Sequence, residues 1–241
     1  MSQTTSKRTT TLAGEEVVYE VTKSDDATQA RIDAGIDGIT VIVPSDAHED
    51  PEAILTENAM WVLDKKAKFD SYRDDVPDRT FEPGETFPYL GEERELVVEP
   101  RKKSVVGEGT IHLRRSAVEQ SSIKRALRNF YRRQAREHLS DRLDHFAAEM
   151  GLEYDGLEIR NQRTRWGSCS TNGTISLNWR LLMAPPEVID YVVVHELAHL
   201  REPNHTDMFW SLVAEHDPRY EEHAEWLEEH SARLVFSRED L

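Results

Sequence analysis

Three histidines and a glutamate interrupt an apolar run near the end of the chain, in VVVHELAHLREPNHTDMFW, residues 192–210. His195 and His199 are four residues apart, so in a helix their imidazoles lie one above the other and can reach one tetrahedral cation. Glu196 lies about 100° around that helix from His195, where its carboxylate can face a water on the cation rather than the cation itself. This spacing indicates a metal site on a buried helix.

A third histidine strengthens the metal interpretation over its alternative, a purely structural cluster of buried, hydrogen-bonded side chains. In an uninterrupted helix, His205 would lie about 9 Å beyond His199 and far around the cylinder. However, Pro203 disfavours the α conformation at the residue before it, and Asn204 tolerates a left-handed turn. The chain can therefore leave the helix and bring the third imidazole back, and Thr206 is placed to cap a new helix.

Three protein ligands would leave one position of a tetrahedral ion open. Zinc with an open position binds water and lowers the pKa of that water to about 7. Glu196 would take the proton as hydroxide attacks a polarised carbonyl, and would then deliver it to the leaving amine. The pattern predicts a peptidase with one Zn²⁺ ion, His195, His199 and His205 as ligands, Glu196 as the catalytic base and acid, and a peptide or protein substrate.

The acidic composition limits what the surface can bind. The chain has 46 acidic and 30 basic residues and a formal net charge of −16, which argues against a whole surface that binds nucleic acid or anionic membranes. Only 8 of the basic residues are Lys, which fits either adaptation to high salt or an ordinary acidic cytosolic protein. The single cysteine, Cys169, excludes an intrachain disulfide and a Cys-rich zinc finger. Because the N-terminus is polar and no apolar run is long enough to span a bilayer, we expect a cytoplasmic protein without membrane contact.

The first half of the chain is predicted to be mostly β. Alternating apolar residues between Glu16 and Val43 predict a small antiparallel meander. Asp50 and Pro51 are suited to begin a helix that runs to about Tyr72, and strand-like alternation returns after a loop at residues 74–86. No repeat of about 20–50 residues is apparent. Residues 1–113 are therefore expected to form an N-terminal, mostly antiparallel β region with one helix.

A helical pattern begins near residue 114, where we place a domain boundary; the second domain spans 114–241. Apolar residues recur at three- and four-residue spacing from Ser116 to Met150. The same helix carries the one dense basic stretch of the chain: Lys124, Arg125, Arg128, Arg132, Arg133, Arg136 and Arg142. This face either binds phosphates or is a solvated face paired with carboxylates. Two strands then follow, joined through Asn172-Gly173 as a hairpin, and lead to the histidine-bearing helix.

At these residues the chain resembles the YgjP-like metal-dependent hydrolases, a zincin group similar to the SprT and WLM metallopeptidases. The match rests on RWGSCSTNGTISLNWRLLMAPPEVIDYVVVHELAHLREPNHTDMFW, residues 165–210. The resemblance implies an α+β fold with a zincin-like metallopeptidase domain, in which the HELAH helix carries the active site. It also implies that the WGSC strand flanks this helix as an edge strand to which a peptide can add. Trp166 and Ser168 would then border the cleft.

Further residues are candidates for supporting roles. Arg163, Arg165 and Asn178 are candidates for substrate contacts. Glu202 is either a second-shell acceptor for a ligand imidazole or a solvated turn residue, and it stands where metzincins have glycine. Cys169 is either a thiolate ligand or a buried structural thiol. Three later histidines are expected at the surface: His216, His223 and His230.

Two other functions stay open at this point. One is a non-catalytic, metal-containing module that holds a peptide or nucleic acid, and the other is a SprT-like protease directed to nucleoprotein substrates. The presence of Glu196 favours an enzyme, because a binding module needs no base beside an open metal position. The Arg-rich helix is the local support for nucleic acid.

Overall fold

The computed structural model describes residues 4–25, 27–35, 38–47, 49–162, 165–237 and 240. The chain divides into two compact units between Val76 and Pro77, and each unit has its own hydrophobic core. This division lies before the boundary expected at residue 114, because the strands that precede residue 114 share one core with the long helix that follows it. Among the described helices, none has the length and apolar content needed to cross a bilayer.

The first unit is a four-stranded mixed sheet with two helices. Its elements are β1 (Thr4–Leu12), β2 (Glu15–Ser24), β3 (Arg31–Gly35), β4 (Gly38–Pro44), α1 (Pro51–Glu57) and α2 (Ala59–Asp74). The strand order is β1-β2-β4-β3, with β2 and β4 parallel. The predicted antiparallel meander is therefore wrong in its central pair. The apolar strand β4 occupies the interior of the sheet, where Val41 and Val43 are buried, and the more polar β3 takes the edge.

Local signals at the helix start of this unit are confirmed. The Asp50 carboxylate accepts a hydrogen bond from the backbone N–H of Glu52 at 3.1 Å, and Pro51 is the first helical residue. The single predicted helix is divided into α1 and α2 at Asn58, whose side chain bonds to the Ile54 carbonyl at 2.8 Å. Strand β1 was not predicted, because its threonine-rich sequence is polar and lacks alternating apolar residues. It forms a strand because threonine is β-branched and suits one.

The second unit begins with another four-stranded sheet and the Arg-rich helix. Its first elements are β5 (Thr86–Tyr89), β6 (Glu92–Glu99), β7 (Val105–Gly107), β8 (Thr110–Arg114), α3 (Arg115–Glu119) and α4 (Ile123–Met150). Ser122 caps α4 by accepting from the Arg125 N–H at 3.2 Å, and Gly151 ends the helix in the left-handed conformation. The helical pattern expected over residues 116–150 is therefore confirmed, with a break after Glu119.

The two four-stranded sheets have the same topology. The order β5-β6-β8-β7 repeats β1-β2-β4-β3, and in both sheets the central pair is parallel and the outer pairs are antiparallel. Both first hairpins turn through two residues of positive φ, Ala13-Gly14 in one and Leu90-Gly91 in the other, which is the geometry of a tight hairpin turn. The two sheets therefore repeat each other in topology and register, although the sequence shows no matching periodicity.

The remaining elements build the part of the second unit that carries the histidines. They are β9 (Gly156–Arg160), β10 (Gly167–Cys169), β11 (Thr174–Asn178), the 3₁₀ turn η1 (Trp179–Met183), α5 (Pro186–Ala198), α6 (Asp207–His216), α7 (Tyr220–His230) and the 3₁₀ turn η2 (Ser231–Leu234). The sheet order is β10-β11-β9, with β10 antiparallel and β9 parallel to β11. The hairpin predicted through Asn172-Gly173 is confirmed as β10–β11, and β10 is the edge strand beside α5.

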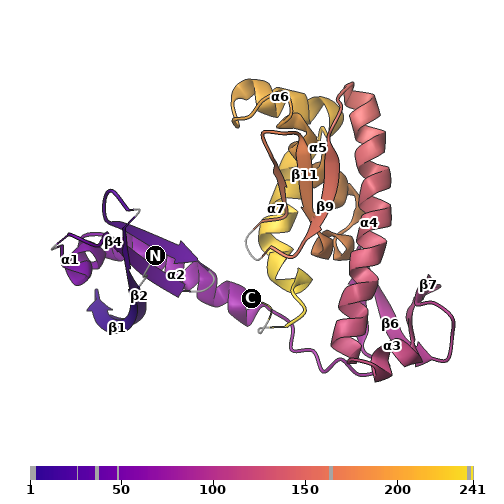
Figure 1. Ribbon diagram of the computed structural model, residues 1–241, viewed down its shortest axis with the longest axis horizontal. Helices are drawn as coiled ribbons and strands as arrows, with labels where there is room; N and C mark the ends of the chain where they lie inside the picture. Colours follow the sequence, from indigo (N-terminus) through magenta and orange to yellow (C-terminus); the bar gives the residue numbers. More distant parts are fainter. Residues whose placement is uncertain are drawn as a thin grey trace. The chain divides into compact units, whose positions relative to one another are not determined.

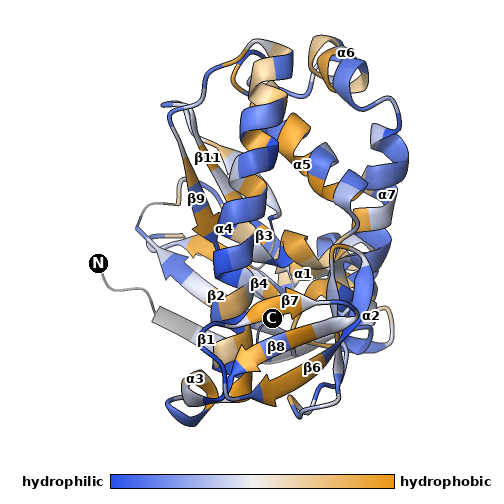
Figure 2. Ribbon diagram, turned by 90° about the vertical axis from the view of Figure 1, so that its right-hand side faces the viewer, coloured by the Kyte–Doolittle hydropathy of each residue, from blue (hydrophilic) through white to orange (hydrophobic). Residues whose placement is uncertain are grey.

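Helix α5 lies in the interior of this unit. Figure 1 shows α4 running along the unit with α5, β9 and β11 beside it. Much of α5 is hydrophobic in Figure 2, and nine of its residues are buried: Val188, Ile189, Tyr191, Val192, Val193, Val194, Glu196, Leu197 and Ala198. Burial of a helix on most of its circumference fixes its position and rotation. The side chains of its last turn are therefore presented from a rigid support.

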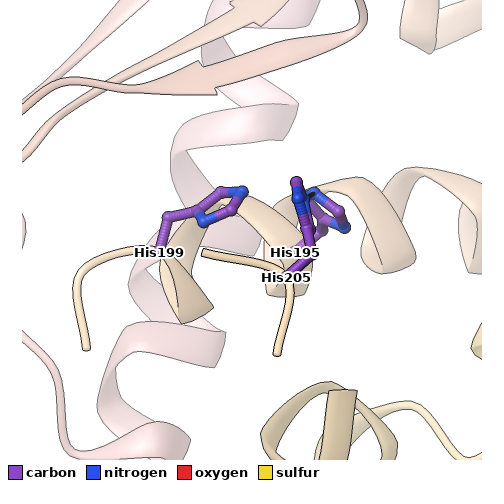
Figure 3. A group of neighbouring side chains, drawn as sticks. All are labelled: His195, His199 and His205. Carbon is purple, nitrogen blue, oxygen red and sulfur yellow. Dashed lines mark hydrogen bonds between the residues drawn. The ribbon is translucent and has the colours of Figure 1, made fainter. Parts of the chain in front are cut away.

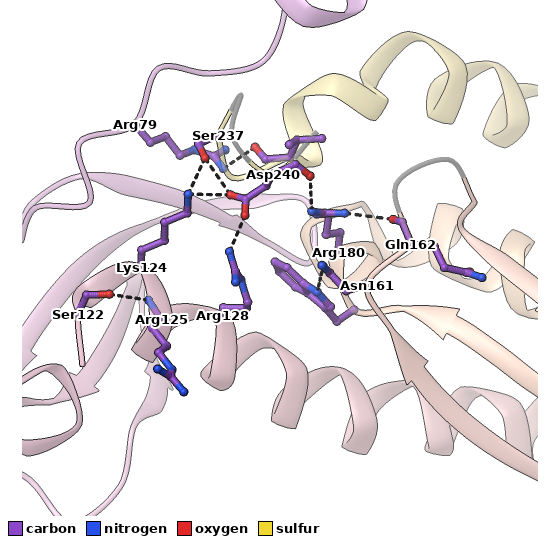
Figure 4. Close-up of polar contacts among 12 residues, drawn as sticks. Arg79, Ser122, Lys124, Arg125, Arg128, Asn161, Gln162, Arg180, Ser237 and Asp240 are labelled. Carbon is purple, nitrogen blue, oxygen red and sulfur yellow. Dashed lines mark hydrogen bonds and ion pairs between the residues drawn. The ribbon is translucent and has the colours of Figure 1, made fainter. Parts of the chain in front are cut away.

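Several of the basic residues of α4 are paired within the second unit. Arg128 and Lys124 contact the Asp240 carboxylate at 2.5 and 3.0 Å (Figure 4), and Arg142 binds Asp190 through two hydrogen bonds of 2.6 and 2.8 Å. Burial raises the pKa of Asp240, but hydrogen bonds from Lys124 and Ser237 and the nearby cations outweigh it and lower the pKa. These contacts support the interpretation of a carboxylate-paired face, and they give no support to a nucleic-acid site.

Candidate metal centre

Pro203 separates helices α5 and α6, and this break determines the path of residues 195–207. Helix α5 ends at Ala198, and His199 occupies its C-cap position. The chain then turns through Pro203, and α6 begins at Asp207 with Thr206 at the N-cap position. His205 lies in this turn and not on a continued helix, as the sequence predicts. Two helices anchored in the core therefore hold the ends of a short segment that carries the third imidazole.

The three imidazoles converge on one point. Each offers a ring nitrogen, and these nitrogens all lie within 4.8 Å of one another; Nε2 of His195 and Nε2 of His205 are 3.1 Å apart. Figure 3 shows His195 and His199 on the end of α5, with His205 reaching the same space from the turn. Ligand nitrogens at about 2.0–2.1 Å from a tetrahedral ion would be roughly 3.3–3.4 Å apart. The residues present therefore fit a small divalent cation.

Their environment favours the neutral forms of His195 and His199, and the neutral imidazole is the form that binds metal. Burial, and to a smaller extent the neighbouring His199 and His205, lower the pKa of His195 to about 4. Burial also lowers the pKa of His199, against a hydrogen bond to the Glu202 carbonyl that raises it. Because a carbonyl can only accept, Nδ1–H of His199 donates to this oxygen at 3.2 Å. Its Nε2 lone pair is therefore left for a ligand role.

Aromatic rings form a wall behind the histidines. The ring centroid of His195 lies 4.9 Å from Phe209, 5.8 Å from Trp210 and 5.8 Å from Tyr191. Burial raises the pKa of Tyr191 to about 12, so its phenol keeps its proton near neutral pH. The sequence analysis did not single out Tyr191, although its position four residues before His195 places both on one helix face.

Glu196 lies between two hollows of the surface. Its side chain is 6% exposed. A hollow of about 370 Å³ and another of about 650 Å³ are both lined by Gly167, His195 and Glu196. Burial raises the pKa of Glu196 to about 7, against the charge of Arg165, which lowers it. A carboxylate with a pKa near neutral can both accept and return a proton, which general acid–base chemistry requires.

The residues expected to border the cleft are found around these hollows. Arg165 and Trp166 line the smaller hollow, towards α7, and Ser168 lines the larger one, towards His199 and His205. Cys169 also lines the larger hollow, but burial and the charge of Glu196 raise the pKa of its thiol, which disfavours a thiolate. In the part of the chain that the structure describes, the three histidines alone form a group with metal-ligand geometry.

Two expected supporting residues act through contacts other than those predicted. Asn178 is 2% exposed, and its amide donates to the carbonyls of Gln162 and Arg165 at 2.7 and 3.1 Å. It therefore holds the segment before β10 and has no side-chain atom left to meet a substrate. Glu202 contacts the imidazole of His199 through its backbone carbonyl and not through its carboxylate. Arg163 lies outside the described residues.

The later histidines are each paired elsewhere. His223 is buried, against the expectation of a surface position, and its Nδ1 lies 2.8 Å from the buried Asp217 carboxylate. His216 contacts Glu149 at 2.9 Å, and His230 contacts the Trp226 carbonyl at 2.9 Å. None of the three lies in the converging group.

Comparison with known proteins gives the family. The family model of the YgjP-like metallopeptidase domain matches residues 28–230. No curated protein matches the chain. Among solved structures, the metallopeptidase zymogen abylysin of Pyrococcus abyssi is 27% identical, with a TM-score of 0.36 over 40% of this chain and 99% of that one. The metallopeptidase zymogen jannalysin of Methanocaldococcus jannaschii is 19% identical, with a TM-score of 0.36 over 39% of this chain and 96% of that one. The chain belongs to the YgjP-like family of metallopeptidase domains and is a metal-dependent peptidase.

Proposed function

We propose that this chain is a zinc peptidase in which His195, His199 and His205 hold one Zn²⁺ ion and Glu196 is the general base and acid. The observation that carries the proposal is the convergence of three imidazole nitrogens within 4.8 Å of one another, in a hollow that the Glu196 carboxylate also lines. Three neutral nitrogen ligands with one open position are the donor set of catalytic zinc.

The zinc ion and the side chains of the protein have separate roles in the proposed reaction. A zinc ion with an open position supplies a Lewis acid, which polarises a carbonyl and acidifies water. The carboxylate of Glu196 would accept a proton from the attacking water and would then give it to the departing amine. Its pKa of about 7 suits both transfers. His195 and His199 stay neutral throughout, because burial disfavours their charged forms.

A peptide or protein is the substrate class that the cleft supports. Strand β10 pairs with β11 on one side only, and its residues Gly167 and Ser168 line the larger hollow beside the histidines. An extended peptide can add to such an edge through main-chain hydrogen bonds. We assign Trp166, Ser168 and Arg165 to the borders of the bound peptide, and Asn178 to the support of the segment that carries them.

The test is to measure bound metal and peptidase activity for the native protein and for Glu196→Gln. We expect the variant to keep roughly one equivalent of zinc and to lose about 10²–10⁴-fold in turnover, because a base is removed and no ligand is lost. Glu202→Gln is a matched control, since Glu202 contacts the site through its carbonyl; it should keep both metal and turnover. Full activity in Glu196→Gln would refute the assigned role.

A further inference from the structure

The backbone of Gly167 lies directly against the side chain of Glu196. A Cβ atom built on Gly167 would lie 2.6 Å from Cγ and 2.7 Å from Cδ of Glu196, and would overlap its Oε1. Gly167 does not adopt a positive φ, so its backbone conformation does not require glycine. The missing side chain is what makes room for the glutamate.

The backbones on both sides of this contact are fixed. Gly167 pairs with Leu177 in the β10–β11 hairpin. The carbonyl of the preceding residue, Trp166, accepts a hydrogen bond of 2.8 Å from the Asn178 N–H, and the Asn178 side chain holds Arg165. On the other side, Glu196 extends from the buried helix α5 and is itself 6% exposed. An added methyl group at position 167 would therefore have to displace the Glu196 side chain, because neither backbone can give way.

We propose that Gly167 is a positioning residue, whose bare Cα sets where the Glu196 carboxylate rests relative to the point shared by the three imidazoles. This inference rests on the proposed role of Glu196 as the base. A base must lie within about 2.6–3.2 Å of the atom whose proton it takes, and a displacement of about 1 Å can cost on the order of 100-fold in rate. A methyl group at position 167 would force a displacement of this size, because ordinary contact begins near 3.4 Å.

The kinetic test uses Gly167→Ala in the full chain. We expect kcat to fall about 10–100-fold, while KM stays within about threefold and bound zinc stays at the native level, because no ligand is changed. Gly156→Ala is the matched control: Gly156 lies in the same three-stranded sheet, and a Cβ there would have nothing within 4 Å. It should leave kcat, KM and zinc at native values.

A shortened carboxylate provides a rescue. Aspartate at position 196 lacks one methylene, so the Cβ of an alanine at position 167 has more room beside it. Glu196→Asp should therefore cost several-fold less in kcat in the Gly167→Ala background than in the native background. Equal costs in the two backgrounds would overturn the proposal, and so would native kcat in Gly167→Ala.

A second test needs no activity and separates this inference from the proposed function. In metal-free protein, Gly167→Ala should lower Tm by several degrees when Glu196 is present, and by about 1 °C or less in a Glu196→Ala background, where the overlap is absent. If Gly167→Ala alone fails to fold, a folded Gly167→Ala/Glu196→Ala double variant supports the contact, and an unfolded one refutes it. Equal losses of Tm in both backgrounds would also refute it. If the native protein showed no zinc-dependent turnover, the proposed function would be refuted. The Tm comparison in the two backgrounds would still test the contact between Gly167 and Glu196.

Discussion

Six histidines lie between residues 195 and 230, and they form two groups with different surroundings. In the first group, the ring nitrogens of His195, His199 and His205 face one another, and the Nε2 atoms of His195 and His205 are 3.1 Å apart. In the second group, each ring has an acceptor of its own: Glu149 for His216, Asp217 for His223 and the Trp226 carbonyl for His230. In the first arrangement the ring nitrogens are placed where one cation could bind all three, whereas in the second arrangement each ring already has a partner within the protein.

The difference follows from spacing and from chain breaks. Residues four apart on a helix are separated by about 6 Å along the axis and share a face, whereas residues seven apart are separated by about 10.5 Å. His223 and His230 are seven apart on α7, so their rings cannot share an ion. The turn at Pro203 brings the third imidazole, that of His205, back to the first pair. The number of histidines is therefore a poor predictor of a metal site, whereas their spacing together with a helix break is a good one.

The largest effect is expected from removing one member of the first group. Loss of a residue that only supports a metal ligand costs about 10–100-fold in affinity. His205→Ala should weaken zinc binding by more than this, because it removes a proposed direct ligand. His205 is exposed and lies in a turn, so its removal opens no cavity in the core and the fold should persist. Bound zinc after dialysis and the Tm gained on adding zinc are the measurements.

His216→Ala is the matched control for that loss. It removes one imidazole from the second group and should keep native zinc content and the native rise in Tm. Zinc lost equally from both variants would mean that the two groups do not differ in the way their geometry indicates.

A loss of stability without loss of metal is expected from His223→Ala. His223 and its partner Asp217 are 7% and 9% exposed, so the variant leaves a buried carboxylate without its imidazole. We expect the free energy of unfolding to fall by about 3 kcal/mol, with zinc content unchanged. Denaturant unfolding of the single variants and of His223→Ala/Asp217→Asn provides the test, and the double variant should be less destabilised than the sum of the two.

The histidine cluster was open to prediction because its signal is local. The four-residue spacing of His195 and His199, and the proline that ends their helix, are visible in the sequence and need no tertiary partner. The helix starts at Asp50-Pro51 and the turn at Asn172-Gly173 are local signals of the same kind. The buried state of Asn178 is not a local signal, because its side chain bonds to the carbonyls of Gln162 and Arg165, which lie 16 and 13 residues away in the sequence.

Sheet topology was the weakest part of the prediction for a related reason. Alternation of apolar residues identifies a strand but does not identify its neighbour. The parallel pairs β2–β4 and β6–β8 each join strands that are separated by another strand in the sequence, so a meander was the simpler expectation. The role of Gly167 is equally hidden, since a glycine in a strand does not reveal which side chain occupies the space it leaves.

A smaller, pH-dependent difference is expected in metal-free protein. Folding lowers the pKa of His195 from 6.5 to about 4, so below a pH of about 6.5 the unfolded chain binds a proton that the native state rejects. The native protein should therefore lose about 2 kcal/mol, after allowance for solvent screening, as the pH falls from about 6.5 to about 4. Relative to the native protein, His195→Gln should lack this loss. Parallel stability curves for the two proteins over this range would contradict the low pKa.

The smallest effect is expected from Cys169→Ser. Cys169 lines the larger hollow with the three histidines, so its residue type makes it a candidate for a fourth ligand. Burial and the charge of Glu196 both raise the pKa of its thiol, and metal ligation by cysteine requires the thiolate. The variant should therefore keep native zinc affinity, and turnover should change by less than about threefold, because serine preserves the size of the side chain. A large loss of zinc from Cys169→Ser would make the ligand set four-membered and closed, and a closed set has no position at which water can be activated.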